Sequence, residues 1–261
     1  MTFALEKKSM EQKEQKEWFS TWFDSPFYHI LYQHRDDKEA EKAVDHLIST
    51  IRIPQGAAVM DLCCGKGRHA VHLQKAGLSV TGLDLSPASI HACKPFENDQ
   101  LQFELHDMRL PYQKKQFDFI VNLFTSFGYF DDAGNEQALL AMKQALKPGG
   151  KIVIDFLNVI PVLNNLPVQE EQMLDGINFN IHKFFKDTKI IKQISFDSDG
   201  KSYQFQEEVN ALRLNDFERY FKNTGFQLIN VFGDYDGRAF NEVDSKRLIL
   251  LLQRDTDVST K

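Results

Sequence analysis

The sequence predicts an α/β protein with three layers. A doubly wound, mostly parallel, seven-stranded sheet carries helices on both faces, and an antiparallel β insertion follows its fifth strand. Between residues 57 and 156, short and almost wholly apolar segments alternate with amphipathic ones, which is typical of buried parallel strands joined by helices. Between residues 177 and 212, three β-rich segments follow one another without a helix, which indicates antiparallel strands.

Five strands and three helices account for the alternating region. The expected strands are Ala57–Leu62, Ser79–Leu83, Leu101–Leu105, Phe117–Leu123 and Lys151–Phe156. The expected helices are Arg68–Ala76 with Gly77 as its stop, Pro87–Cys93 with Ser86 as its N-cap, and Asn135–Leu146 before a turn at 147–150. A helix at Leu214–Asn223, capped near Asn215 and stopped by Gly225, and strands at Phe226–Phe232 and Arg247–Gln253 complete the core.

The remaining segments define the predicted organisation. Residues 1–17 form a charged tail, and residues 18–56 form an aromatic lid and a helical segment, with an amphipathic helix at Asp36–Ser49. Seven Phe, Tyr and Trp residues and one histidine fall within Trp18–Tyr32, so this segment must be buried or must cover a ligand. Residues 57–176 and 213–254 form the core. Residues 177–212 form the antiparallel insertion, whose expected strands are Ile177–Phe185, Ile190–Phe196 and Tyr203–Leu212, as a lid or a dimer interface.

Composition narrows the function. The 261 residues are 42% hydrophobic and 26% charged, which is ordinary for a globular protein, and the chain is expected to be a monomer or a homodimer. The formal net charge of −6 disfavours a nucleic-acid partner. No apolar run is long enough for a membrane span or a secretion signal, so a cytoplasmic location is expected. Cys63, Cys64 and Cys93 form neither a disulfide framework nor a zinc spacing, and no metal is expected.

A glycine-containing loop after the first strand predicts a ligand site. Gly65 and Gly67 lie between the strand and the next helix, at the edge where open parallel sheets bind ligands, and their spacing fits a dinucleotide fingerprint as well as an S-adenosylmethionine loop. Three successive strands end in Asp61, Asp84 and Asp107. Asp84 suits the ribose of either cofactor, but a carboxylate at Asp61 would repel a pyrophosphate and attract a cationic ligand. The acids therefore favour S-adenosylmethionine.

Five segments, in order, resemble the Rossmann-like (class I) S-adenosylmethionine-dependent methyltransferases over about residues 18–254. They are Val59–Gly67 (VMDLCCGKG), Gly82–Ser86 (GLDLS), His106–Met108 (HDM), Phe117–Phe124 (FDFIVNLF) and Leu146–Asp155 (LKPGGKIVID). Cys63 departs from the family pattern, since many members have a glycine there. Leu123–Asp131 (LFTSFGYFD) and Asp155–Val159 (DFLNV) further resemble small-molecule N-methyltransferases of the glycine and amino-sugar kind.

The resemblance implies a set of site residues. Cofactor contacts are expected from Tyr32, Arg35, Asp61, Cys63, Gly65, Gly67, Asp84, Leu85, Asp107, Met108 and Leu123. Asp107 would hold the adenine amino group, Met108 would pack on the ring, and Arg35 would bind the cofactor carboxylate. Tyr28, Phe124, Phe127 and Tyr129 are expected to edge the substrate cavity. The catalytic residue stays open: His29, Tyr129 and Asn158 are candidate bases by position only, and an amine acceptor needs none if it arrives neutral.

The function expected from this reading is methyl transfer from S-adenosylmethionine to a small-molecule acceptor by in-line displacement. The main alternative is the same core acting on RNA or protein. An NAD-dependent oxidoreductase and a cofactor-binding protein without transferase activity are further alternatives. The sequence does not identify the acceptor.

Overall fold

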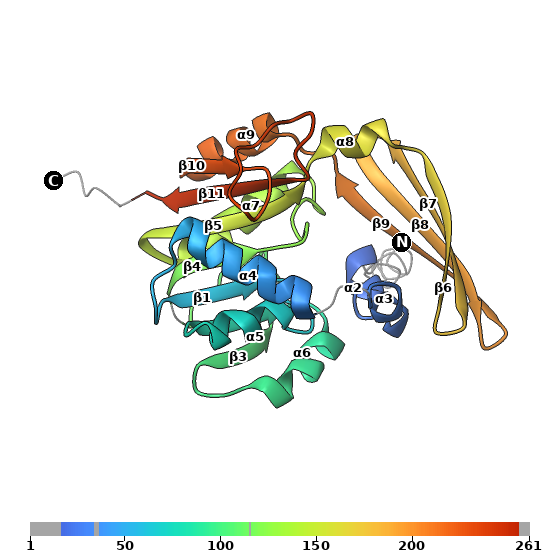
Figure 1. The fold of residues 1–261 in the computed structure, drawn as a ribbon, viewed down its shortest axis with the longest axis horizontal. Coiled ribbons are helices and arrows are strands. Elements are labelled where there is room, and N and C mark those ends of the chain that lie inside the picture. Colours follow the sequence, from blue (N-terminus) through green and yellow to red (C-terminus); the bar gives the residue numbers. More distant parts are fainter. Residues whose placement is uncertain (1–16, 34–36, 115, 256–261) are drawn as a thin grey trace, which may run out of the picture.

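The computed structural model describes residues 17–33, 37–114 and 116–255. Its centre is a seven-stranded sheet with the order β10-β11-β5-β4-β1-β2-β3 (Figure 1). All its strands are parallel except β11, which runs antiparallel to both neighbours. The strands are β1 (Ala58–Leu62), β2 (Ser79–Asp84), β3 (Leu101–Leu105), β4 (Phe117–Asn122), β5 (Leu146–Leu157), β10 (Phe226–Phe232) and β11 (Arg247–Arg254). The predicted seven-stranded, mostly parallel sheet is confirmed.

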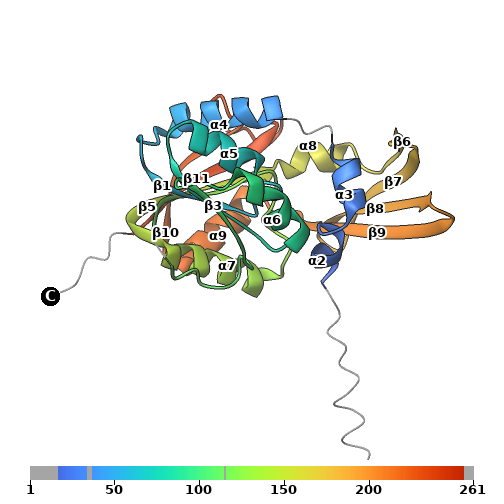
Figure 2. The same ribbon diagram turned by 90° about the horizontal axis from the view of Figure 1, so that it is seen from below.

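Helices cover both faces of this sheet (Figure 2). One face packs against α4 (Asp37–Ile51), α5 (Arg68–Lys75) and α6 (Pro87–Cys93), which a short 3₁₀ turn at Lys94–Phe96 follows. The other face packs against α7 (Asp132–Ala145) and α9 (Leu214–Thr224). The sheet and the helices packed on its two faces form the three layers that the alternating pattern predicts.

Several predicted boundaries shift for local reasons. Helix α7 begins three residues earlier than expected, because the Asp131 carboxylate caps it by accepting from the Gly134 N–H at 2.8 Å. The expected turn at 147–150 lies within β5, where a register shift opposite β4 absorbs the extra residues. Helix α9 is capped at Arg213, not near Asn215, because the Asp216 carboxylate accepts from the Arg213 N–H at 2.9 Å.

A second, antiparallel sheet follows β5 after a short helix, α8 (Val159–Asn164). Its strands pair in chain order and are β6 (Val168–Leu174), β7 (Ile177–Lys186), β8 (Lys189–Ser198) and β9 (Lys201–Asn210). Strands β7, β8 and β9 correspond to the three expected segments. Helix α8 and strand β6 were not predicted, because β6 is a partly exposed edge strand rich in Gln and Glu that carries little apolar pattern.

The aromatic segment lies between the two sheets (Figure 1). It forms α2 (Trp18–Trp22) and α3 (Pro26–Leu31), and its Trp22 and Leu31 pack in a third core against β7 and β8. We call residues 17–33 the lid. Residues 1–16 of the expected tail, and Arg35, lie outside the described residues.

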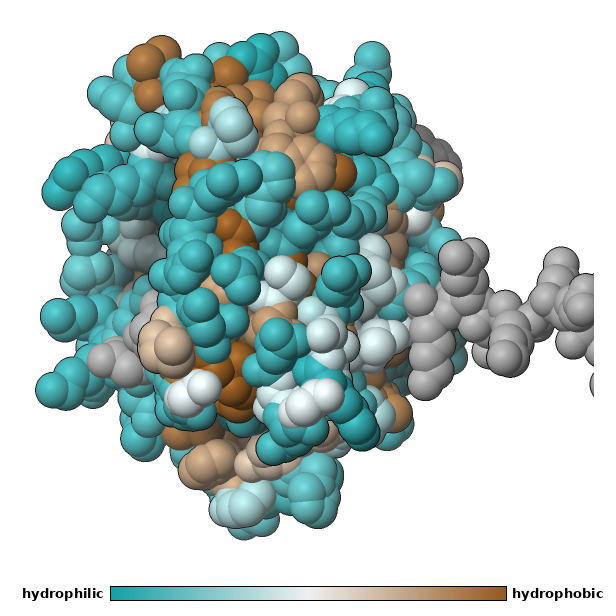
Figure 3. Space-filling view, turned by 90° about the vertical axis from the view of Figure 1, so that its right-hand side faces the viewer, coloured by the Kyte–Doolittle hydropathy of each residue, from teal (hydrophilic) through white to brown (hydrophobic). Residues whose placement is uncertain are grey.

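The outward face of the second sheet is largely hydrophilic (Figure 3). A shallow hollow of about 610 Å³ crosses it and is lined mostly by amide and other polar side chains, among them Gln169, Asn180, His182, Gln193, Ser195, Gln204 and Gln206. Within the described part of the chain, no helix has the length and apolar character needed to span a bilayer.

Gly67 is required by close packing between the first helix and the sheet. Its φ is +76°, and a Cβ there would lie 2.7 Å from the Phe103 ring. Gly200 has a similar φ of +71° but nothing within 4 Å of such a Cβ, so it is a matched control for backbone strain alone. We expect Gly67→Ala to lower the free energy of unfolding by about 2–4 kcal/mol, combining strain with overpacking, and Gly200→Ala by about 1 kcal/mol. Urea denaturation measures both, and equal losses would contradict this packing role.

Candidate active site

A cavity of about 900 Å³ opens at the carboxyl edge of the central sheet. The loops after β1, β2, β3 and β4 form its floor, the lid covers it, and β7, β8 and β9 form its far wall. Ligands of open parallel sheets bind at this edge, and the volume is within the usual range for ligand pockets.

Most of the residues predicted from the sequence line this cavity. Of the expected cofactor contacts, those that do are Tyr32, Asp61, Cys63, Gly65, Asp84, Leu85, Asp107, Met108 and Leu123. Of the expected substrate contacts, Tyr28, Phe124 and Tyr129 do. The expectation for Arg35 falls on a residue that the structure does not describe.

Two expected residues lie elsewhere. Phe127 is 1% exposed and packs in the core, with its ring centroid 5.7 Å from that of Phe217, so it does not edge the cavity. Gly67 starts α5 and faces Phe103. Phe130, three residues further along the chain, lines the cavity with Tyr129. The sequence could not distinguish these aromatic residues, because the segment has no regular period.

Asp61 is the most deeply buried acid of the cavity floor. The side chain is 1% exposed, and within the described residues no donor reaches its Oδ2 atom. Burial, reinforced by the charge of Asp84, raises the pKa of Asp61 to about 7. A buried carboxylate with an unpartnered oxygen is a site for a cationic group.

Asp84 shapes the glycine loop. Its Oδ2 accepts from the Gly65 N–H at 2.8 Å, and its Oδ1 accepts from the Ser86 N–H at 2.9 Å. Burial raises the pKa of Asp84, although these hydrogen bonds oppose the shift. Because the Gly65 N–H already has a carboxylate partner, it is not free for a pyrophosphate, which argues against a dinucleotide.

Cys63 occupies a left-handed position, with φ +64°. Glycine adopts this conformation without strain, which explains physically why a glycine suits this position. The Cys63 thiol lies 3.7 Å from the sulfur of Met108, and burial raises the pKa of the thiol well above its usual value. Cys63 is therefore a neutral part of the cavity wall and is not a nucleophile.

A strained turn after β4 forms another part of the wall. Phe124 and Thr125 have φ values of +57° and +61°, which cost about 1–3 kcal/mol each for residues other than glycine. Asp155 holds the turn, because its Oδ2 accepts from the Phe124 N–H at 2.8 Å and its backbone carbonyl accepts from the Thr125 N–H at 3.0 Å. Arg247 donates to Asp155 Oδ1 at 2.6 Å and to Thr125 Oγ1 at 2.8 Å.

No local motif in the sequence marks this network. Asp155 and Arg247 are 92 residues apart and meet only because β11 pairs with β5. Tyr235 adds a hydrogen bond to Asp155 Oδ2 at 2.7 Å. Burial alone would lower the pKa of Arg247. The charge of Asp155 and its hydrogen bond to Arg247 outweigh burial, so the pKa is raised above its usual value.

Charged residues occupy the far wall, opposite the cofactor floor. Glu207 accepts hydrogen bonds from Trp22 Nε1 at 2.6 Å and from the Tyr32 hydroxyl at 2.8 Å. The Lys192 ammonium donates to the same Tyr32 hydroxyl at 2.6 Å. Lys183 also lines this wall and pairs with Glu170 at 2.6 Å. None of these lysines and acids was expected, because no local motif marks them.

The candidate bases differ in position. Asn158 is buried and donates to three backbone carbonyls of residues 241–245, away from the cavity. Tyr129 lines the cavity and donates its hydroxyl hydrogen to the Thr125 carbonyl at 2.7 Å. His29 also lines the cavity, and burial together with the charge of Lys66 lowers its pKa to about 4, so it is neutral at neutral pH.

The sheet order, the glycine loop and three strand-end acids define a class of α/β enzymes that bind a nucleoside cofactor at this edge of the sheet. Residues 59–150 match a methyltransferase domain family. The Bacillus subtilis protein "Putative methyltransferase YqeM" is 25% identical over 79% of this chain and 87% of its own length. A Streptomyces venezuelae dTDP-amino-sugar N,N-dimethyltransferase is 31% identical over 49% of this chain and 54% of its own length.

Two solved structures share the fold of this chain. An S-adenosylmethionine-dependent methyltransferase from Clostridium acetobutylicum superposes with a TM-score of 0.73 and 19% identity, over 88% of this chain and 96% of the other. The amino pentose methyltransferase CalS10 from Micromonospora echinaspora, solved with S-adenosylmethionine, gives a TM-score of 0.66 and 19% identity, over 88% and 97%. Residues 59–150 therefore match a methyltransferase domain family, and the chain has the fold of Rossmann-like S-adenosylmethionine-dependent methyltransferases.

The raised pKa of Asp61 predicts a pH dependence of ligand binding. S-Adenosylhomocysteine, the product form of the cofactor, carries an ammonium group that the ionised carboxylate attracts. Because the pKa of Asp61 is about 7, the dissociation constant should fall between about pH 6 and about pH 8 as the carboxylate ionises. Isothermal calorimetry tests this, and Asp61→Asn should bind more weakly with a smaller pH dependence.

The stability of the ligand-free protein should fall as the pH rises, whereas the affinity for the ligand should increase. The folded pKa of Asp61, about 7, lies above its ordinary value of 3.8. This group therefore contributes stability that is fully present below about pH 4 and is lost as the pH rises through about 7. The rise in melting temperature that S-adenosylhomocysteine causes should grow with pH. An affinity and a melting shift that do not change with pH would contradict the role of Asp61.

Removing the Asp155 charge should destabilise the fold strongly. Asp155→Asn removes the buried counter-ion of the partly buried Arg247 guanidinium and weakens its hold on the strained turn, so we expect a loss of about 2–4 kcal/mol in free energy of unfolding. Glu208→Gln breaks a partly exposed pair with Lys189 and should cost less than about 1 kcal/mol. Chemical denaturation compares them, and similar losses would show that the turn does not depend on Asp155.

Proposed function

We propose that this protein transfers the methyl group of S-adenosylmethionine to a small-molecule acceptor, with an amine as the nucleophile, by in-line displacement. The observation that carries the proposal is the single cavity that joins the acidic floor to the charged and aromatic far wall. Its volume of about 900 Å³ suits a cofactor and a small acceptor together. Because the lid and the second sheet wall it in, a folded macromolecule has little access.

The residues of the floor fit S-adenosylmethionine. The unpartnered Oδ2 of Asp61 suits the ammonium group, and Asp84, which already orders the loop, suits the ribose hydroxyls. Gly65 has nothing within 4 Å of where a Cβ would lie, so the cofactor can approach its backbone closely. The ring-stacking role proposed for Met108 is supported by its place in the wall beside Asp107.

The bound cofactor supplies a sulfonium-activated methyl group. The task of the chain is then to hold the acceptor nitrogen in line with the methyl carbon and to exclude water, and such positioning accounts for about 7–11 kcal/mol in favourable cases. Phe19, Tyr28, Tyr129 and Phe130 give the lid side of the cavity an aromatic surface. An amine that arrives neutral needs no base, and the neutral imidazole of His29 is a weak base at most.

Support for an amine acceptor comes from relatives. The Streptomyces venezuelae enzyme is an amino-sugar N,N-dimethyltransferase, and CalS10 is an amino pentose methyltransferase. For this chain, the charged far wall with Lys183, Lys192 and Glu207 supports a polar, small acceptor. The proposal includes a cytoplasmic location, since the cysteine pattern is that of a reducing compartment.

A transfer assay tests the proposal. The purified protein is incubated with S-adenosylmethionine carrying a labelled methyl group and with a cell extract separated into small-molecule, RNA and protein fractions. We expect label to enter the small-molecule fraction, and Asp61→Asn to lose most of it. Label confined to RNA or protein would replace this function with the alternative acceptor class. Binding of NAD but not S-adenosylhomocysteine would exclude both.

A further inference from the structure

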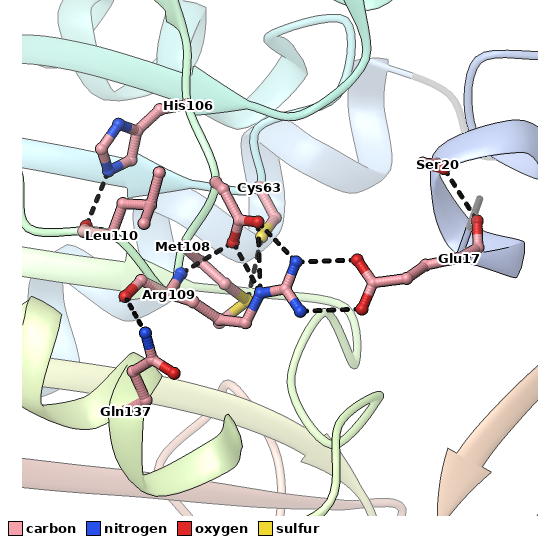
Figure 4. Close-up of polar contacts among 9 residues, drawn as sticks. Glu17, Ser20, Cys63, His106, Met108, Arg109, Leu110 and Gln137 are labelled. Atoms are coloured by element: carbon pink, nitrogen blue, oxygen red, sulfur yellow. Dashed lines mark hydrogen bonds and ion pairs between the residues drawn. The ribbon is translucent and has the colours of Figure 1, made fainter. Parts of the chain in front are cut away.

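One arginine that the function does not use connects the lid to the cofactor floor. The Arg109 guanidinium lies between two carboxylates (Figure 4). Its Nη1 and Nη2 donate to the two oxygens of Glu17, each at 2.7 Å, and Nη2 also donates to Asp107 Oδ2 at 2.6 Å. Glu17 precedes the first helix of the lid, and Asp107 lines the cavity.

Arg109 provides the hydrogen bonds that hold the Asp107 carboxylate. Its Oδ1 accepts from the Arg109 N–H at 2.9 Å, and Nε lies 3.1 Å from both carboxylate oxygens. Burial opposes ionisation of Asp107, but the hydrogen bonds and charge of Arg109 outweigh it and keep its pKa below its usual value. A carboxylate has about four acceptor positions, so the orientation of Asp107 toward the cavity depends on Arg109.

Aromatic packing surrounds the same guanidinium. Its central carbon lies 4.5 Å from the centre of the Phe130 ring and 5.8 Å from that of Phe19. The two rings also meet edge to face, with centroids 5.5 Å apart. Phe19 belongs to the lid and Phe130 to the cavity loop after β4, so the aromatic contact joins the lid to that loop, while the charged contact joins the lid to the loop after β3.

A separate contact holds the middle of the lid. The Asp24 carboxylate accepts from Ser86 Oγ at 2.7 Å and from the Ala88 N–H at 2.9 Å, at the start of α6. This contact does not involve Arg109. Loss of the Arg109 contact therefore frees the Glu17 end of the lid while the Asp24 contact remains.

We propose that Arg109 is a positioning residue that fastens the closed lid, through Glu17, to the Asp107 carboxylate beside the cofactor. The inference rests on the proposed function, because the ligand that the lid encloses is the cofactor. The Arg109 side chain is 24% exposed and that of Glu17 is 45% exposed. An ion pair this accessible to water is weak enough to open and close repeatedly, while its bidentate geometry gives the closed lid one orientation.

The chain provides its own reporter of lid motion. The sequence has two tryptophans, Trp18 and Trp22, and both lie in α2. Trp18 packs edge to face on Tyr129, at 5.2 Å between centroids, so its surroundings change when the lid opens. Intrinsic tryptophan fluorescence therefore reports on the lid alone.

The test is stopped-flow tryptophan fluorescence during binding and release of S-adenosylhomocysteine by the full chain. We expect Glu17→Gln to raise the dissociation rate constant about two- to fivefold, as fits the loss of an exposed ion pair, with little change in melting temperature without ligand. Arg109→Gln should raise it further, because Asp107 also loses its partner, and Arg109→Lys should restore part of the loss. The double variant should release no faster than Arg109→Gln, since both changes break one contact.

Matched variants separate this role from a general charge effect. Arg213 and Glu242 form a more exposed ion pair at 3.2 Å outside the cavity lining, so Arg213→Gln and Glu242→Gln should leave the dissociation rate at the wild-type value. Unchanged release by Glu17→Gln, or additive effects in the double variant, would overturn the role of Arg109. If the wild-type protein did not bind S-adenosylhomocysteine at all, the proposed function would fail instead.

Discussion

A buried carboxylate without a full set of partners is the constraint around which the site is built. Asp61 is 1% exposed near the end of β1, and its Oδ2 has no donor among the described residues. Ionising such a group costs free energy that a cationic ligand recovers on binding. The parallel arrangement of β1, β2 and the strands around them brings Asp61 and Asp84 to one edge, so the topology itself makes the floor acidic.

The rest of the cavity depends on structures that enclose this floor. The lid is held between two sheets, with Trp22 packed against the second sheet and Phe19 against the loop after β4. That loop contains the strained residues Phe124 and Thr125, whose conformation is maintained by the buried Asp155. Aromatic packing encloses the cavity, while the ion pair between Asp155 and the partly exposed Arg247 fixes the shape of the wall beside the cofactor floor.

The sequence predicts elements well where local signals agree and poorly where partners are distant. Helix α6 was predicted at its observed bounds because Ser86 and Pro87 specify its start, and β3 was predicted at its observed bounds, where apolar residues alternate with polar ones. Strand β6 was missed because an exposed edge strand rich in Gln and Glu has no apolar face to detect.

The site residues also divide into those that a local signal marks and those that depend on distant partners. Asp61, Asp84 and Asp107 line the cavity because each lies at or just beyond the end of a strand, whereas Phe127 packs in the core, and neighbouring aromatic residues carry no sign of which faces inward. Arg247 reaches the cavity through the pairing of β11 with the distant strand β5, and Glu207 meets the distant lid through Trp22, and no local pattern reports either contact. Arg109 carried a usable signal, since it directly follows the third motif, His106–Met108.

The central claim is that one cavity holds the cofactor on its acidic floor and the acceptor against the far wall. A crystal structure of the protein with S-adenosylhomocysteine tests this most directly. The account predicts the ligand's ammonium group next to Asp61 Oδ2, the ribose on Asp84, and the sulfur facing the open volume in front of Tyr32 and Glu207. A ligand bound elsewhere, or one with its sulfur turned toward the sheet, would contradict the account.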